Sequence, residues 1–201
     1  KDFVLRENDI ERNGHIYCKV CGKRVDGELL DLGFTKFIPR IKCECEIKRD
    51  KENEERERLM KISTLKRDCF SSPLQHQYTF EKFLNEKGQA YKVAYNYAKS
   101  FEQMKEDNVG LLFYGDVGSG KTYLACSIAN ELIERKQVKV KIMNLSQVIN
   151  QIQKSAFKLD SNEIINNLSN IPLLILDDLG IERDTSYARE QVYNIINSRY
   201  L

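Results

Sequence analysis

Apolar residues in the second half of the chain follow two spacings, and their order predicts strands that alternate with helices. Short apolar runs at 111–114 and 172–178 have the length and composition of strands in a parallel sheet, and residues 138–144 alternate between apolar and polar as a further strand would. Residues 123–136 carry an apolar stripe at helical spacing, and a further helix, N-capped by Ser146, is expected after the second strand. This alternation is typical of an α/β fold.

The segments that flank these strands add shorter elements. Residues 89–104 place apolar side chains at a helical period, which Asp107 and Asn108 end. Another short helix is expected to close at Leu168. An aromatic-rich stretch at 78–83 leads into the first of these helices; packing in the core is its favoured role, and contact with a bound base is the alternative.

Charge replaces apolar periodicity in the first third of the chain. Residues 46–66 are dominated by charges of both signs, which favours a solvent-exposed connecting helix; a partner-binding helix is the alternative. We place a domain boundary near Met60. Residues 1–60 would then form a small domain with a helical linker, and residues 61–201 would form the larger domain.

Composition narrows the class of protein. The 201 residues include 32 basic and 30 acidic side chains, a net charge of +2, and the mean hydropathy is −0.52. No run approaches the roughly 20 apolar residues that span a bilayer, and the first residues lack the apolar region of a signal peptide. We therefore expect a soluble cytoplasmic protein without membrane contact, in which any nucleic-acid contact comes from a local basic patch.

Two close cysteine pairs lie in the small domain. They are formed by Cys18, Cys21, Cys43 and Cys45. Four cysteines are typical of a closed, tetrahedral structural zinc site, and Zn²⁺ binding would supply much of the folding free energy of so small a domain. Disulfides, free thiols, or replacement of one cysteine by His15 are the alternatives. Cys69 and Cys126 are expected to be buried as small apolar residues.

A glycine-rich stretch connects the first predicted strand to the helix after it. It matches G-x-x-x-x-G-K-[ST] at every fixed position, and this context predicts a loop whose N–H groups hold phosphate. Lys121 would contact the β- and γ-phosphates, and the Thr122 hydroxyl would bind Mg²⁺. The predicted nucleotide-binding residues are Gly115, Asp116, Val117, Gly118, Ser119, Gly120, Lys121, Thr122 and Tyr123, together with Asp177.

Two carboxylates end the apolar run at 172–178. Asp177 would hold magnesium directly or through water, and Asp178 is placed to act as the general base on the attacking water. Asp178 and Lys121 are therefore the predicted catalytic residues. ATP or ADP is favoured over guanine nucleotides because the chain has no N-K-x-D pattern.

The sequence around these acids resembles the Walker B region of DnaC/DnaI-type replicative helicase loaders and their IstB relatives, an AAA+ group. The family pattern LLxxDDLG-x-E, followed by a helix ending in IINxRY, is matched by Leu173, Leu174, Asp177, Asp178, Leu179, Gly180, Glu182, Ile195, Ile196, Asn197, Arg199 and Tyr200. The resemblance runs from about residue 78 to the end. The cysteine-pair module resembles the N-terminal helicase-binding domain of DnaI-type loaders.

The resemblance implies an AAA+ P-loop sheet flanked by helices, and a function in DNA replication. Such a protein binds ATP and single-stranded DNA, grips a hexameric replicative helicase through its zinc domain, self-associates through the AAA+ domain and places the helicase on DNA. The family's sensor strand and arginine finger are expected beyond Leu201, and Arg199 is not expected to replace the finger. The AAA+ domain is therefore expected to be C-terminally incomplete, with weak hydrolysis.

Two alternative functions remain. An IstB-type transposition helper ATPase shares the same core and acts with a transposase on duplex DNA. A zinc-bearing adaptor would bind the helicase and use a non-hydrolysing nucleotide site for stability alone. The cysteine-pair module favours the loader over the transposition ATPase.

Overall fold

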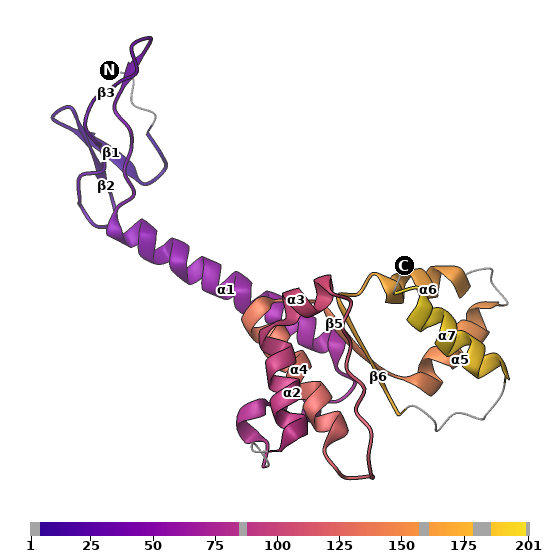
Figure 1. Ribbon diagram of the computed structural model, residues 1–201. Helices are drawn as coiled ribbons and strands as arrows, with labels where there is room; N and C mark the ends of the chain where they lie inside the picture. Colours follow the sequence, from indigo (N-terminus) through magenta and orange to yellow (C-terminus); the bar gives the residue numbers. More distant parts are fainter. Residues whose placement is uncertain (1–4, 85–87, 157–160, 179–185, 200–201) are drawn as a thin grey trace. The chain divides into compact units, whose positions relative to one another are not determined.

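The computed structural model describes residues 5–84, 88–156, 161–178 and 186–199 (Figure 1). It divides the chain into two compact units, Lys1–Met60 and Lys61–Leu201. Helix α1 (Glu44–Cys69) begins in the first unit and ends in the second. Within the described part of the chain, no helix is long and apolar enough to cross a membrane.

The first unit consists of two β-hairpins and the start of α1. Strands β1 (Asp9–Arg12) and β2 (His15–Cys18) pair antiparallel, and so do β3 (Leu30–Asp31) and β4 (Lys36–Phe37). Asn13 and Gly14 join β1 to β2 with φ values of 51° and 75°, as a tight two-residue hairpin turn requires. The core of the unit is small, and its buried apolar members are Ile16, Cys18, Val25 and Cys43.

The second unit is an α/β structure built on one parallel strand pair. Strand β5 (Val140–Asn144) pairs with β6 (Leu173–Asp177), so that Val140 lies beside Leu173 and Asn144 beside Asp177. Its helices are α2 (Gln89–Lys99), α3 (Phe101–Glu106), α4 (Lys121–Lys136), α5 (Leu145–Ala156), α6 (Ser161–Ser169) and α7 (Ser186–Asn197), with short 3₁₀ turns η1 (Pro73–Gln77) and η2 (Phe80–Lys82).

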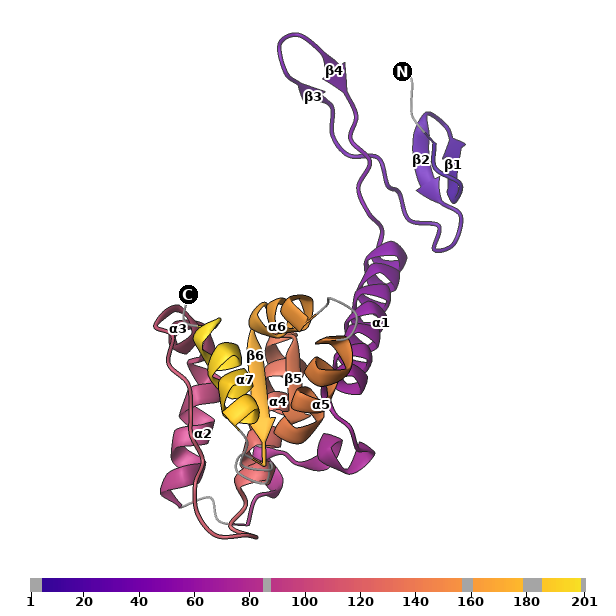
Figure 2. The ribbon, with the colours of Figure 1, turned by 90° about the vertical axis from the view of Figure 1, so that its right-hand side faces the viewer.

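Helices cover both faces of the strand pair because side chains alternate between the faces. Ile142 and Ile175 pack with α4 and α2 on one face. Met143, Leu174 and Leu176 pack on the other face with side chains of α5, α6 and α7. Figure 2 shows α5, α6 and α7 around β5 and β6, with α4 behind the strands.

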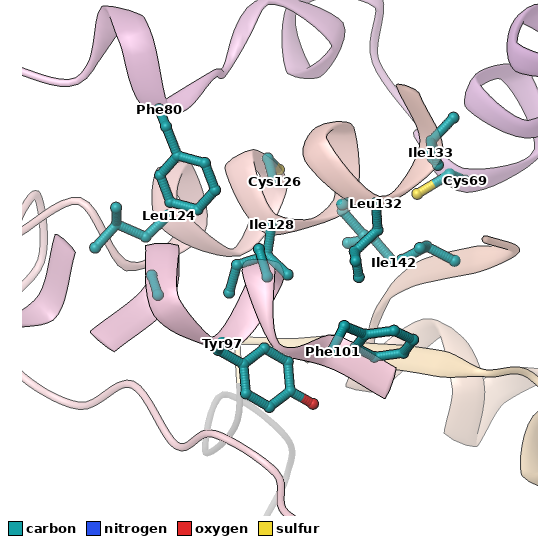
Figure 3. Packing of buried hydrophobic residues seen from close by; sticks show 14 of the residues in the cluster. Cys69, Phe80, Tyr97, Phe101, Leu124, Cys126, Ile128, Leu132, Ile133 and Ile142 are labelled. Carbon is teal, nitrogen blue, oxygen red and sulfur yellow. The ribbon is translucent and has the colours of Figure 1, made fainter. Parts of the chain in front are cut away.

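Helix α4 is the centre of the larger core. Leu132, Ile133 and Cys126 on this helix have no exposed surface, and Leu124 and Ile128 are nearly as buried. Figure 3 shows Ile128 and Leu132 on the side of this helix that faces Tyr97 and Phe101. The expectation that Cys69 and Cys126 are buried is confirmed, and burial raises the pKa of each thiol to about 12.

Three local predictions differ from the structure. The prediction of a strand at 111–114 is wrong, because these residues have no ladder partner in the described chain. Their side chains still alternate: Leu112 and Tyr114 are exposed, while Leu111 and Phe113 pack on the core. The helix predicted at 89–104 breaks at Ser100. Ser146 lies inside α5, because Asn144 caps this helix by accepting a hydrogen bond from the Ser146 N–H at 2.9 Å.

Candidate phosphate-binding site and metal centre

The glycine-rich loop has the backbone conformation that its glycines allow. Gly115, Gly118 and Gly120 have φ values of 135°, 83° and 92°, a region in which a side chain would be strained. Helix α4 begins directly after the loop, and the first N–H groups of a helix have no partner within it. The Lys121 ammonium donates hydrogen bonds to the carbonyls of Gly115 (2.8 Å) and Asp116 (2.7 Å). Loop, helix terminus and ammonium thus converge in one place.

A side-chain contact joins the loop to the acidic strand end. The Thr122 hydroxyl donates a hydrogen bond to the Asp177 carboxylate over 3.1 Å, although the two residues are 55 positions apart. Thr122 is on the first turn of α4, and Asp177 is the last residue of β6. A hydroxyl and a carboxylate oxygen this close are the ligand types that Mg²⁺ prefers.

Asp178 follows the strand end and is held by Asn144, a residue that the motifs in the sequence did not indicate. The Asp178 backbone has a left-handed φ of 58°, its side chain is exposed, and its carboxylate accepts a hydrogen bond from the Asn144 side-chain amide at 2.8 Å. Asn144 ends β5 beside Asp177 in the parallel register. A polar residue at the end of the strand before the acids was the available signal, since parallel strands end at the same sheet edge.

Aromatic side chains form a wall beside the loop. The Tyr123 ring stacks on Tyr78 at 4.6 Å and contacts Phe83 at 5.3 Å, and its hydroxyl donates to the Thr79 carbonyl. A Cβ on Gly120 would lie 3.0 Å from the Phe83 ring. The Tyr123 side chain therefore belongs to this wall, and only its backbone N–H remains a candidate for phosphate.

Asn130 holds in place the segment that carries Tyr78, and no sequence motif indicated Asn130 either. This residue is 1% exposed on α4, and its side-chain amide donates to the carbonyls of Gln75 and Tyr78, both at 2.9 Å. The signal available in the sequence was an asparagine on an otherwise apolar face of the predicted helix. Its hydrogen bonds hold the 3₁₀ turn η1 against α4.

The four cysteines of the first unit come together. The sulfur atoms of Cys18, Cys21, Cys43 and Cys45 all lie within 4.8 Å of one another. Cys43 and Cys45 are 3.0 Å apart, and Cys18 and Cys45 are 3.6 Å apart. Tetrahedral zinc with bonds of about 2.3 Å places its sulfurs roughly 3.8 Å from each other, so the cluster fits the ion. His15 lies elsewhere, bonded to Asp26 at 2.8 Å.

The backbone near Cys18 favours a thiolate. Hydrogen bonds from the N–H groups of Cys21 and Val20 lower the pKa of Cys18 to about 7. Gly22, with φ of 69°, closes this turn by donating its N–H to the Cys18 carbonyl. The pKa of Cys45 is raised, first by its hydrogen bond with Cys43 and then by burial. The four sulfur atoms could hold a metal ion.

The remaining family-pattern residues are partly described. Leu179, Gly180, Glu182 and Tyr200 lie outside the described residues. Arg199 has a structural role: its guanidinium donates to the carbonyls of Leu168 and Ser169 at the end of α6. Ile195 is fully buried beside them.

Comparison with known proteins gives a family match that includes the phosphate loop and Asp177. The family model for the bacterial DnaA ATPase domain matches residues 74–200. The chain is 27% identical over 154 residues to the replicative helicase loader DnaI of Bacillus subtilis, which covers 76% of this chain and 48% of DnaI. It is 28% identical over 132 residues to the replicative helicase loader DnaC of Escherichia coli K12, covering 63% and 52%.

A third relative comes from a phage-like element. The PBSX protein XkdC of Bacillus subtilis is 32% identical over 138 residues, which cover 62% of this chain and 50% of XkdC. The chain thus spans about half the length of these relatives. Because the family model covers well over half of the chain, it belongs to the bacterial DnaA ATPase-domain family and is homologous to the DnaI and DnaC helicase loaders.

Proposed function

We propose that the second unit binds ATP with Mg²⁺ as the nucleotide-dependent part of a replicative helicase loader. The contact between Thr122 and Asp177 carries this proposal, because it brings two oxygen ligands together beside the phosphate loop. The loop backbone, the start of α4 and Lys121 would hold the phosphates. Bound Mg²⁺ would neutralise phosphate charge during transfer to water.

The catalytic residues follow from the same geometry. Lys121 would exchange its two loop carbonyls for phosphate oxygens, since an ammonium forms stronger hydrogen bonds with an anion. Asp178 would accept the proton of the attacking water while Asn144 holds its other carboxylate oxygen.

The proposal includes a full AAA+ sheet with another strand beside β6. It is supported by the half-buried state of all five β6 residues, since central strands are covered on both faces.

The first unit is proposed to hold one structural Zn²⁺ and to bind the helicase. Cys18, Cys21, Cys43 and Cys45 would be the four ligands, which leaves the ion no open position for catalysis. The loader role, the hexameric helicase partner, single-stranded DNA binding, self-association and a cytoplasmic location are all part of the proposal. It is supported by homology to DnaI and DnaC, whose names describe replicative helicase loaders.

Calorimetric titration tests the nucleotide site. We expect Lys121→Ala to abolish measurable ATP binding, because it removes the cation that faces the phosphates. Lys139→Ala, an exposed lysine at the edge of β5, is the matched control and should bind ATP normally. Unchanged ATP affinity in Lys121→Ala would refute the assignment of the loop.

Helicase binding tests the role of the first unit. Purified chain should carry about one zinc and should retain the replicative helicase of its source organism in a pull-down. Replacing Cys18 and Cys21 by serine should abolish retention, with ATP affinity unchanged. If residues 61–201 retained the helicase alone and residues 1–60 did not, the proposed division of labour would be wrong.

A further inference from the structure

The β3–β4 hairpin of the first unit, residues 29–37, is an exposed arm with an unusual concentration of apolar side chains. Every one of these nine residues is exposed. The large apolar side chains among them are Leu29, Leu30, Leu32, Phe34 and Phe37, with exposed fractions from 44% for Phe37 to 87% for Phe34. Figure 2 shows this arm extending away from β1 and β2. Exposed apolar clusters on a small domain are typical of protein contact sites.

The register of the hairpin separates its apolar residues from its charges. Leu30 lies opposite Phe37, and Asp31 lies opposite Lys36. Because successive residues of a strand point to opposite faces, Leu30 and Phe37 share one face and the two charges share the other. The two-residue strands thus present an apolar face that no described residue of the first unit buries.

Hydrogen bonds define the tip of the hairpin. The Leu32 N–H donates to the Thr35 carbonyl at 3.0 Å, and the Gly33 N–H donates to the Asp31 carboxylate at 2.9 Å. Gly33 has a φ of 81°, which suits this turn. Phe34 follows in the turn, so its ring is presented to solvent by a hydrogen-bonded loop. A loop whose backbone is already held by hydrogen bonds loses less conformational entropy on binding than a flexible one.

Charge indicates what this face would contact. Asp31 and Lys36 are the two charged residues of 29–37, and they pair with each other at 2.7 Å. The arm therefore has no net positive charge to attract a polyanion such as DNA. A charged protein surface would be desolvated on contact with this apolar face and would gain no ion pair in return. The complementary surface is an uncharged, apolar groove of a protein.

We propose that the apolar face of residues 29–37 is the surface with which the first unit contacts the helicase, and that Phe34 is its anchor in an apolar groove of a helicase subunit. This inference rests on the proposed function. It adds the residues, the chemistry of the contact and a prediction about salt.

Binding of the 201-residue chain to the source organism's purified replicative helicase tests the inference. We expect Phe34→Ala to raise Kd about 30-fold, the size of effect typical of a buried aromatic anchor. Leu32→Ala should weaken binding as well. Leu59→Ala is its matched control on α1, since the two leucines are 51% and 55% exposed, and it should bind normally. Zinc content should be unchanged in all three variants.

The outcomes separate the inference from the proposed function. If the wild type binds the helicase and Phe34→Ala binds equally well, the inference is wrong and the loader role stands. If the wild type does not bind the helicase, the proposed function fails and the inference with it. If the contact is apolar, the Kd should change by less than about three-fold between 50 and 300 mM salt. A steep loss of affinity for the helicase over this range would overturn the inference. Loss of a wild-type dimer in Phe34→Ala, by sedimentation equilibrium, would assign the face to self-association instead.

Discussion

At the scale of single residues, Asn144 connects three parts of the second unit. Its side-chain oxygen caps α5 through the Ser146 N–H, and its amide donates to Asp178, which follows the β6 strand end. Asp178 has a strained, left-handed backbone, and this hydrogen bond fixes its side chain. We therefore expect Asn144 and Asp178 to act together in ATP hydrolysis, and Asn144 to stabilise α5 independently of Asp178.

Turnover measurements on purified chain test this pair. Asp178→Asn should keep ATP affinity and lower the hydrolysis rate about 10²- to 10⁴-fold, because an amide does not accept the proton of water. Asn144→Ser should retain a helix cap, since serine is also a good N-cap residue, and should still lower turnover. Equal turnover in wild type and Asp178→Asn would show that another group is the base.

Residue type and spacing are enough to predict much of the candidate site. Lys121, Thr122, Asp177 and the four cysteines follow from spacing, because these chemistries require particular side chains at particular intervals. Asn130 and Asn144 do not, since an asparagine has no spacing rule. The role of each depends on the placement of α4 against η1, and of β5 beside β6.

At the scale of elements, a buried ion cluster joins the hairpins of the first unit to α1. Arg40 donates two hydrogen bonds of 2.7 Å to Asp9 on β1 and one of 2.9 Å to Glu46 in the first turn of α1. Glu46 in turn accepts the N–H of Cys43 at 3.1 Å. The cluster therefore positions the second cysteine pair against β1.

Removing one member should expose how much the cluster stabilises the unit. We expect Asp9→Asn to lower the free energy of unfolding of the zinc-loaded first unit by about 3 kcal/mol, because it leaves the largely buried Arg40 guanidinium with Glu46 as its one carboxylate partner among the described residues. Asp31→Asn makes the same change in the exposed Asp31–Lys36 pair and should lower the stability much less, because solvent screens that pair. Urea unfolding followed by metal release measures both.

The pH dependence of this effect has a definite sign. The hydrogen bonds from Arg40 hold the pKa of Asp9 below its ordinary value, against the opposing effect of burial. Its stabilisation is fully present above the unfolded-state pKa of about 3.9 and is lost as the pH falls through the folded-state value. The gap between wild type and Asp9→Asn should be equal at pH 8 and pH 6, and should narrow below about pH 4. A gap that widened on acidification would contradict this assignment.

At the scale of the whole molecule, the chain has two units with separate cores. The first core has four buried apolar members, two of which are the proposed zinc ligands Cys18 and Cys43. The second unit has a much larger core around α4. The first unit should therefore depend on metal, and the second should not.

Metal removal tests this independence. A strong chelator should unfold residues 1–60 and abolish helicase binding, while ATP affinity stays within about two-fold of its starting value. Adding zinc back should restore helicase binding. Loss of ATP binding together with the metal would show that the two units fold as one.

The sequence by itself determined the elements that follow from local pattern, namely the strands β5 and β6, the helix after the glycine loop and the charged helix, and it singled out the cysteine pairs and the acids as candidate ligands. These depend on side-chain type and spacing within short segments. Tertiary structure alone decided that residues 111–114 have no ladder partner in the described chain, that the Asn144 amide meets Asp178, and that Thr122 meets Asp177. Such outcomes depend on which segments become neighbours, and hydrogen bonds between distant residues leave no periodic signal along the chain.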